Sequence, residues 1–471
     1  MGNDLAFMPA LDQAAMLRAG ECTSVELVEQ YLERIERLNP RLDAFLTVAA
    51  DQVLEAARAA DARITEGRGA ATDELPPFLG VPISIKDLAD TAGIRTTHGT
   101  ATWKDRIPAQ DAEVVARVRR AGFVILGKTN TPEFGSRSTT RSPGYPSARN
   151  PWDEARSPGG SSGGAAAALA AGLCAISHGT DGGGSIRIPA AWCGLFGLKP
   201  TRGRVSSAPA LQSWNSVNGP IARTVSDAAA MLDAIAGPAP GDSWWAPAPE
   251  RPFLSEVGAP AGRLRIAWTA THPDPDGVVE AAWAEAVRAT VGILEGLGHE
   301  LVEATVPAID FLSCALIPAA EIASRPDLPA LDSLDVPNQT LVAVAGAATA
   351  LDLATAERVL SDDTRRVAEF FTGFDVLLTP TLAAAPPPVT DEMMGDEDWE
   401  GMLSLLKVVA FTPTWNMTGQ PAVAIPAGFD ADGLPVSVQL VGHPADEATL
   451  LRIAAQLEEA RPWRSNRPAV S

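Results

Sequence analysis

Two glycine-flanked serine sites hold the residues whose types and spacing could do chemistry in this sequence. Ser161 and Ser162 stand between two pairs of glycines, and Ser185 follows three glycines in a row. Glycine tolerates backbone angles that other residues avoid and lets the main chain approach a ligand, so nearby N–H groups can point at a bound group. We therefore interpret residues 157–204, which hold both sites, as a catalytic or binding centre; a pair of flexible linkers is the alternative.

Lys86 is a further candidate. It ends the apolar run 79–86, which is typical of a strand, and it is one of five lysines in a chain whose lysines and arginines total 37. Arginine cannot be deprotonated, so a lysine kept at this place is a candidate base. Full burial lowers the pKa of a lysine by roughly 3 to 5 units from about 10.4. The residues alone leave open the alternative of a strand-end lysine that pairs with Asp87.

Other chemistries fit the sequence less well. The five histidines have no metal-ligand spacing, and the four cysteines include no CxxC pair. Residues 159–163 match GxSxG, but a nucleophile elbow follows a buried strand, whereas the segment 149–158 is polar and contains proline. No GK[ST] follows the glycines, which argues against a phosphate-binding loop. We therefore predict neither a metal site nor a nucleotide site.

Composition limits the partners of the chain. It has 471 residues, of which 46% are hydrophobic, and a formal net charge of −21. Nucleic acids and anionic membranes need a basic surface, so we expect neither as a partner. No apolar run reaches the roughly 18 residues of a membrane span, and the N-terminus lacks the pattern of a secretion signal. We expect a cytoplasmic monomer or homodimer that binds a small molecule.

The predicted elements are those of an α/β protein. Residues 1–70 are expected to form helices on the outside of the fold, beginning with a capping box at Thr23–Glu26 and a helix that ends at Asn39–Pro40. Strand, helix and strand then follow one another from 79 to 127. We predict a single domain, 1–471, with a central mixed, mostly parallel twisted β-sheet covered by helices on both faces.

Two later segments are harder to place. Residues from about 304 to 373 are predicted to be mostly helical and to form a peripheral insertion. The segment 383–400 combines an Ala/Pro-rich patch with an acidic one and is expected to be a surface loop, with a lid as the alternative. Nearer the C-terminus, an Asp-Gly turn between two apolar runs indicates a hairpin.

The glycine-rich centre resembles the hallmark of one family, the amidase signature enzymes, which is GGSSGG followed by GTDxGGSIRxPAxxCGxxGxKPTxGR. The likeness extends to Lys86-Asp87, Asn150-Pro151-Trp152 and Asn416 to Ala422, and so covers nearly the whole chain except about 240–400. It implies the amidase signature fold. The residues that match the hallmark are Gly159 to Gly164, Gly179 to Asp181, Gly183 to Arg187, Pro189-Ala190, Cys193-Gly194, Gly197, Lys199 to Thr201 and Gly203-Arg204.

The resemblance implies a role for each matching residue of the centre. Ser185 would be the nucleophile, Ser161 a second serine in an unusual cis-peptide conformation, and Lys86 the terminal base. The N–H groups of Gly182, Gly183, Gly184 and Ser185 would form the oxyanion hole. The remaining assignments are Asp181, Arg187 and Ser162 as the groups that hold the loop, and Phe134, Gly135, Tyr145 and Trp214 as candidates for the acyl pocket.

The activity implied by the resemblance is hydrolysis of a carboxamide or related C–N acyl bond through an acyl-enzyme on Ser185. No metal or organic cofactor would take part. Within the family, the layout resembles bacterial aryl acylamidases, oligoamide hydrolases and urethanases, so amides, carbamates and esters are all candidate substrates. The alternative is the glutamine-hydrolysing A subunit of a tRNA-dependent amidotransferase.

Overall fold

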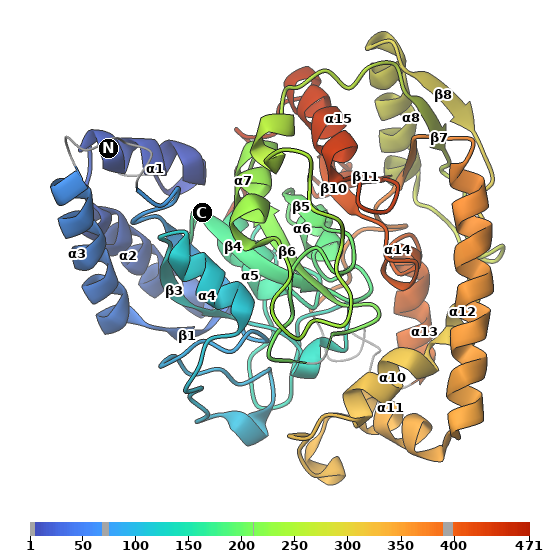
Figure 1. The fold of residues 1–471 in the computed structure, drawn as a ribbon, viewed down its shortest axis with the longest axis horizontal. Coiled ribbons are helices and arrows are strands. Elements are labelled where there is room, and N and C mark those ends of the chain that lie inside the picture. The colour runs from blue at the N-terminus through green and yellow to red at the C-terminus, as the bar shows by residue number, and fades with distance from the viewer. Residues whose placement is uncertain (1–4, 68–74, 211, 390–398) are drawn as a thin grey trace.

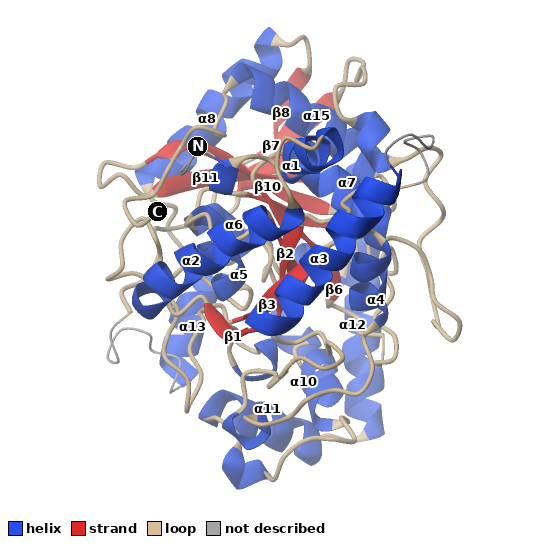
Figure 2. Ribbon diagram, turned by 90° about the vertical axis from the view of Figure 1, so that its left-hand side faces the viewer, coloured by secondary structure: helices blue, strands red, loops and turns tan. Residues whose placement is uncertain are grey.

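An eleven-stranded mixed β-sheet forms the centre of the computed structural model, which describes residues 5–67, 75–210, 212–389 and 399–471. The strand order is β1-β3-β2-β4-β6-β5-β10-β11-β9-β7-β8. Helices lie on both sides of this sheet (Figure 2), as predicted. The strands are β1 (Phe45–Val48), β2 (Pro82–Lys86), β3 (Val124–Thr129), β4 (Ile176–Asp181), β5 (Phe196–Lys199), β6 (Val217–Ala222), β7 (Arg265–Trp268), β8 (Glu300–Glu303), β9 (Val376–Pro380), β10 (Ala422–Phe429) and β11 (Pro435–Val441).

The mixed sheet that we predicted is present, but its strands are not mostly parallel. In the described part of the chain, β2 pairs in parallel with β3 and β4, and β7 pairs in parallel with β8 and β9. The pairings of β1 with β3 and of the central strands β4, β6, β5, β10, β11 and β9 are antiparallel. The predicted hairpin is one reason, because the short turn at Gly433 forces β10 and β11 to run in opposite directions.

The helices between these strands follow the sequence closely. The box at Thr23 forms as predicted, since its hydroxyl accepts the Glu26 N–H and the Glu26 carboxylate accepts the Thr23 N–H. The helix passes Pro40, where we expected it to end, and stops at Asp43 with φ 47°. The helices are α1 (Ala10–Ala19), α2 (Ser24–Leu42), α3 (Ala50–Gly67), α4 (Glu113–Arg120), α5 (Gly163–Ala170), α6 (Arg187–Trp192), α7 (Val225–Ile235), α8 (Ala281–Gly296), α9 (Phe311–Cys314), α10 (Leu316–Ala323), α11 (Val336–Ala347), α12 (Ala350–Phe371), α13 (Trp399–Val408), α14 (Thr414–Met417) and α15 (Glu447–Ala460).

The alanine-rich helix α5 lies in the core, and every one of its residues is buried. Its small side chains let it approach neighbouring backbone closely. A Cβ at Gly164 would collide with the main chain of Asn130, and a Cβ at Gly160, just before the helix, would lie 2.5 Å from the Thr139 carbonyl oxygen. This packing holds Ser161 and Ser162 at the N-terminal end of α5, while Ser185 stands just before α6.

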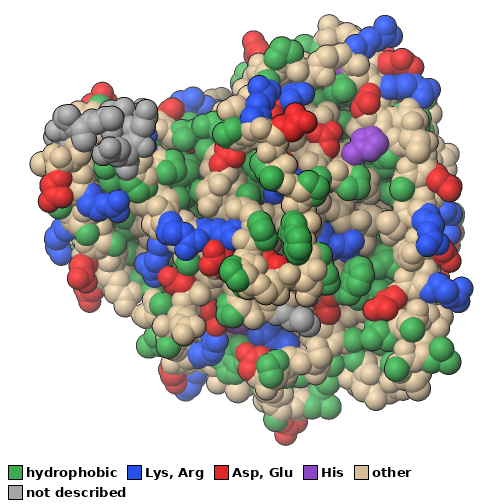
Figure 3. Space-filling view, viewed as in Figure 1, with side chains coloured by type: hydrophobic (Ala, Val, Ile, Leu, Met, Phe, Trp, Pro, Cys, Tyr) green, Lys and Arg blue, Asp and Glu red, His purple; other side chains and the backbone are tan. Residues whose placement is uncertain are grey.

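The segment 304–373 is helical, and its helices α10, α11 and α12 lie together at one side of the molecule (Figure 1). No single described helix is long and apolar enough to cross a membrane, although the bent pair α11 and α12 reaches that length and composition jointly. Figure 3 shows charges of both signs scattered over the face that it displays. Of the predicted loop 383–400, residues 390–398 lie outside the described part. Its residues Pro387 and Val389 form main-chain hydrogen bonds with Ser157 and Ala155.

Candidate active site

Lys86 lies at the end of β2 with its amine fully buried. The Nζ atom is 2.7 Å from the Ser161 hydroxyl oxygen and 2.8 Å from the Thr180 hydroxyl oxygen. Burial without a carboxylate in hydrogen-bond contact holds the pKa of this amine well below its ordinary value, and the field of Asp181 offsets the effect only in part. A neutral amine beside a hydroxyl can take up its proton, which is the task that a general base performs.

The two serine sites contact each other through the main chain. The peptide bond between Gly160 and Ser161 is cis, as the resemblance implied. The N–H of Ser162 donates to the carbonyl oxygen of Ser185 at 3.2 Å. The Ser162 hydroxyl donates to the carbonyl oxygen of Thr180 at 3.1 Å, on the strand that leads to the second site. Two segments that are more than 20 residues apart in sequence therefore share one rigid frame.

Ser185 stands at the edge of this frame, 8% exposed. Within the described residues its hydroxyl has no hydrogen-bond partner, so it is free to meet a ligand. Catalytic hydrogen bonds are often formed only when substrate is bound, so the absence of a Ser185–Ser161 hydroxyl contact among the described residues does not exclude a proton relay between them. The structure thus brings together the three residues that the resemblance names, with the Lys86–Ser161 contact already made.

The glycines before Ser185 differ from one another. The Gly184 N–H donates to a carboxylate oxygen of Asp181 at 2.7 Å, so this group is engaged and, contrary to our expectation, does not face an oxyanion. Among the described residues the N–H groups of Gly182, Gly183 and Ser185 have no acceptor. The carbonyl oxygens of Gly182 and Gly183 are held by Asn215 Nδ2 at 2.9 Å and by Thr412 Oγ1 at 2.7 Å. Because a peptide unit is planar, fixing a carbonyl also fixes the direction of the following N–H.

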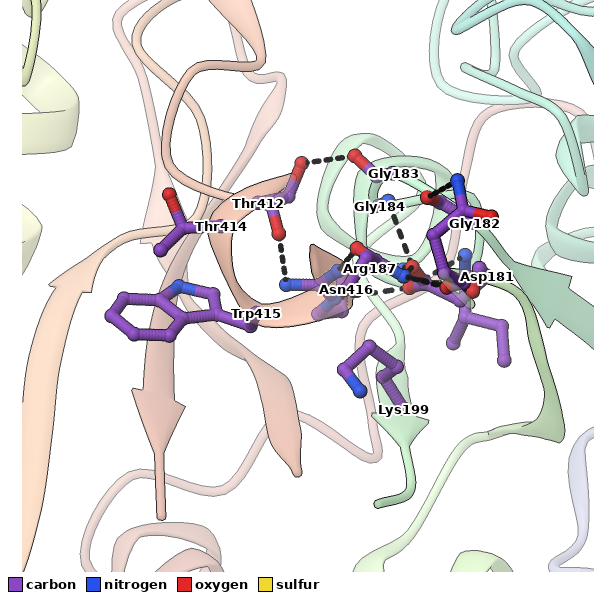
Figure 4. Close-up of polar contacts among 12 residues, drawn as sticks. Asp181, Gly182, Gly183, Gly184, Arg187, Lys199, Thr412, Thr414, Trp415 and Asn416 are labelled. Atoms are coloured by element: carbon purple, nitrogen blue, oxygen red, sulfur yellow. Dashed lines mark hydrogen bonds and ion pairs between the residues drawn. The ribbon is translucent and has the colours of Figure 1, made fainter. Parts of the chain in front are cut away.

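Asp181 and Arg187 form a fully buried ion pair beneath this loop, with Nη2 2.9 Å from Oδ1. Although burial by itself raises the pKa of a carboxyl, the Arg187 guanidinium holds the pKa of Asp181 well below its usual range. Figure 4 shows Arg187 and Asn416 converging on Asp181 beside the glycine loop. The guanidinium also donates to the Thr412 carbonyl and to Gln439. A buried charge needs such partners, and together they anchor the loop to the C-terminal strands.

Comparisons with known proteins show the family of the chain. A family model described as Amidase matches residues 26–451. The chain belongs to the amidase signature family. AmiB2 of Mycobacterium tuberculosis, whose name describes it as a presumed amidase, is 44% identical over 99% of both chains.

Two solved structures of amidase signature enzymes show how similar the folds are. The structure of 6-aminohexanoate cyclic dimer hydrolase with its substrate has a TM-score of 0.90 and 34% identity, with 99% of both chains covered. A bacterial aryl acylamidase of the family has a TM-score of 0.85 and 25% identity, covering 98% of this chain and 99% of that one. The enzyme is therefore an amidohydrolase of this family, which acts on C–N bonds of linear or cyclic amides.

The predicted pocket residues of this amidase signature enzyme take different places. Gly135 lies against the site, since a Cβ there would be 3.2 Å from the Ser161 hydroxyl oxygen. Phe134, with φ 51°, packs its ring against His98. Trp214 is 39% exposed and belongs to the loop 213–216 that contacts Gly182. Tyr145 donates its hydroxyl to the Thr100 carbonyl at 3.2 Å, which ties it to the 97–100 loop rather than to the serines.

Three further contact residues were missed by sequence reasoning. Thr180 accepts a contact from Lys86, and its place in the GTD motif could have indicated it. Asn215 and Thr412 hold the glycine carbonyls, but both lie outside the glycine-rich centre 157–204 and carry no distinctive spacing. Only the packed structure shows that they belong to the site.

Replacement of single glycines by alanine should distinguish Gly183, which has space for a side chain, from Gly184, which has none. Gly183→Ala adds a Cβ that meets nothing within 4 Å, so we expect a midpoint of thermal unfolding close to that of the wild type. Gly184→Ala places a side chain at φ +123° against Thr412, and we expect a loss of at least about 2 kcal/mol in the free energy of unfolding. Thermal and urea unfolding of the two variants measures this; equal stability would contradict the assigned geometry.

Proposed function

We propose that this amidohydrolase cleaves its substrate through an acyl-enzyme on Ser185, with Ser161 and Lys86 as the proton relay. The observation that supports the relay best is the 2.7 Å contact between a buried amine of lowered pKa and the Ser161 hydroxyl. Lys86 takes the proton of Ser161 while Ser161 takes the proton of Ser185. The resulting oxygen nucleophile forms a bond to the carbonyl carbon of the substrate, and the carbonyl π electrons move to its oxygen.

The remaining steps use the same groups in reverse. The N–H groups of Gly182, Gly183 and Ser185 are free to donate to the negative oxygen of the tetrahedral intermediate. As the C–N bond breaks, the proton held on Lys86 returns through Ser161 to the leaving nitrogen. Water then attacks the acyl carbon and gives its proton to Ser161, which passes its own proton to Lys86. As the bond between the acyl carbon and the Ser185 oxygen breaks, the relay returns a proton to that oxygen and the acid leaves. Acylation as a whole and deacylation as a whole therefore each return Lys86 and Ser161 to their starting protonation states.

The proposed substrates are small amides, with oligoamides and aryl amides first and carbamates and esters as further candidates. The similarity to the cyclic dimer hydrolase and the aryl acylamidase supports this order. Trp214, which is 39% exposed, offers apolar surface on the loop that contacts Gly182, and such surface discriminates between substrates by only about 1–3 kcal/mol per methylene. Broad acceptance is the expected consequence. We further propose that the chain acts by itself, as a monomer or homodimer in the cytoplasm, where its four free cysteines would stay reduced.

A substrate panel tests this proposal. The purified chain is incubated with an anilide, a linear alkyl amide, a cyclic diamide of 6-aminohexanoate, an ester, a carbamate and glutamine. Acid release is measured for each substrate, and the quenched protein is analysed by intact mass spectrometry for an acyl adduct. We expect turnover of at least one amide and an added acyl mass on the wild type. Hydrolysis of glutamine alone would instead favour the amidotransferase subunit, and no turnover of any amide would contradict the proposal.

A further inference from the structure

Glu321, in the last turn of α10, reaches the loop that borders the active site. One carboxylate oxygen accepts the Ser213 hydroxyl at 2.5 Å, and the other accepts the Trp214 main-chain N–H at 2.6 Å. Hydrogen bonds to a charged acceptor are about twice as strong as those between neutral groups. The helical segment 304–373, which we predicted to be a peripheral insertion, is therefore fastened to the site by a carboxylate with two donors.

The loop 213–216 transmits this contact to the catalytic glycines. The Ser213 oxygen accepts the N–H groups of Asn215 at 3.2 Å and Ser216 at 3.0 Å, which makes the loop a tight turn. Asn215 then donates its side-chain amide to the Gly182 carbonyl oxygen at 2.9 Å. Its own carbonyl accepts from Asn416, which also binds Asp181. A continuous set of hydrogen bonds thus runs from Glu321 to the Gly182–Gly183 peptide.

The direction of the Gly183 N–H depends on this set. The Gly182 carbonyl and the Gly183 N–H belong to one planar trans peptide, so they point in opposite directions. Asn215 holds the carbonyl on one side and thereby aims the N–H to the other side, where among the described residues nothing accepts it. Without Asn215 in place, the peptide that joins Gly182 and Gly183 could rotate with little steric resistance, because neither glycine has a side chain.

We propose that Glu321 is a positioning residue for amide hydrolysis: it fixes the loop 213–216 so that Asn215 aims the Gly183 N–H at the oxyanion. The proposal rests on the acyl-enzyme function proposed above for Ser185. Glutamine in place of Glu321 would keep the size of the side chain but could accept only one of the two donors, because its amide nitrogen is itself a donor.

Arg202 supports the same loop from the other side. Its guanidinium donates to the Trp214 carbonyl oxygen at 2.6 Å and lies 5.1 Å from the centre of the Trp214 ring. Burial raises the pKa of Glu321, and the nearby Arg202 charge acts in the opposite direction. The two side chains therefore hold Trp214 by its N–H and its carbonyl, which leaves the loop little freedom to move independently of α10.

A mutant cycle tests this role. Glu321→Gln, Asn215→Ala and the double variant are compared with the wild type on an amide that it hydrolyses, with active sites counted by fluorophosphonate labelling. We expect each single variant to lower kcat by about 10- to 100-fold while KM changes by less than about 3-fold, because the interaction acts on the transition state. The kcat of the double variant should be close to that of the slower single variant, since both substitutions act through one set of contacts.

The controls separate positioning from stability and from the function itself. Glu357→Gln removes the same charge from an exposed position of α12 and should leave kcat unchanged. Unchanged kcat per labelled site in Glu321→Gln, even with a lowered midpoint of unfolding, would overturn the proposal, as would effects that multiply in the double variant. Ser185→Ala is measured beside them: if it keeps full turnover, the acyl-enzyme function fails, whereas if it is inactive and Glu321→Gln is not impaired, only the positioning role fails.

Discussion

Ser185→Ala is expected to lose turnover by roughly 10⁶-fold, the scale on which removal of the nucleophile acts in another serine hydrolase. The reason is that the two serines of the first glycine-flanked site are less accessible than Ser185: Ser161 is 1% exposed and Ser162 is fully buried. The same variant should fail to gain mass from a fluorophosphonate, whereas the wild type gains one adduct. Intact mass spectrometry and acid release on the same samples measure both effects.

Ser361→Ala is the matched control for this experiment, since it removes an exposed serine from α12. It should be labelled and active like the wild type. Labelling and full turnover of Ser185→Ala would place the nucleophile elsewhere and contradict the proposed mechanism.

Lys86→Met is expected to lower kcat/KM by about 10²- to 10⁴-fold, the usual contribution of a general base, without loss of stability. Methionine fills a similar volume, and it removes a buried amine whose charged form is strongly disfavoured there. Two hydrogen bonds are lost, but the cost of burying the amine is lost as well. The midpoint of thermal unfolding should therefore be equal to or above that of the wild type. A variant that is both inactive and strongly destabilised would instead indicate a structural lysine.

The pH dependence of Lys86 gives an independent signature. Its neutral form is the base, so wild-type kcat/KM should rise with pH and reach its plateau well below the ordinary lysine value of 10.5. Because the folded pKa is lowered, the folded state binds fewer protons than the unfolded state between these two values. The associated stability is fully present above pH 10.5 and is lost as the pH falls through the folded pKa.

Lys86→Met should lack both the rise in kcat/KM and this part of the pH dependence of unfolding. Lys104→Met, which removes an exposed lysine, should keep both. Both variants are measured by urea unfolding and by kinetics at a series of pH values. If the kcat/KM of Lys86→Met still follows the pH dependence of the wild type, another group is the base.

The centre of the site was predictable because its chemistry is local. Ser161, Ser185 and Asp181 lie within one glycine-rich stretch, and Lys86 ends the strand that pairs beside it, so residue types and spacing indicated them together. The individual state of each glycine was not predictable. Gly184 directly follows Gly183 in a run of three glycines, yet its N–H donates to Asp181, and only the packed loop shows this.

The sheet and the supporting contacts show where sequence reasoning stops. An apolar run has the same appearance whether its strand pairs in parallel or antiparallel, so the antiparallel centre of the sheet was missed. Pairing of β10 with β5 brings Thr412 and Asn416 to the glycine loop from more than 220 residues away. Thr412 has no sequence pattern that could have indicated the contact, and Asn416 lies in a segment that resembles the family without showing which residues it binds. Glu321 likewise could not be predicted, because it lies in the segment of about 240–400, where no motif resembles the family.

The long reach of the Arg187 contacts has a consequence for synthesis of the chain. Arg187 binds Gln439, which follows it by 252 residues, and at about 5–20 residues per second roughly 13–50 s separate their translation. During that interval the nascent polypeptide already contains Lys86, both serines and the Asp181 partner of Arg187, but it lacks the neutral acceptors Thr412, Asn416 and Gln439 that complete the hydrogen bonding of the buried guanidinium. We therefore expect the nascent chain to be inactive until its last strands, β10 and β11, have been synthesised.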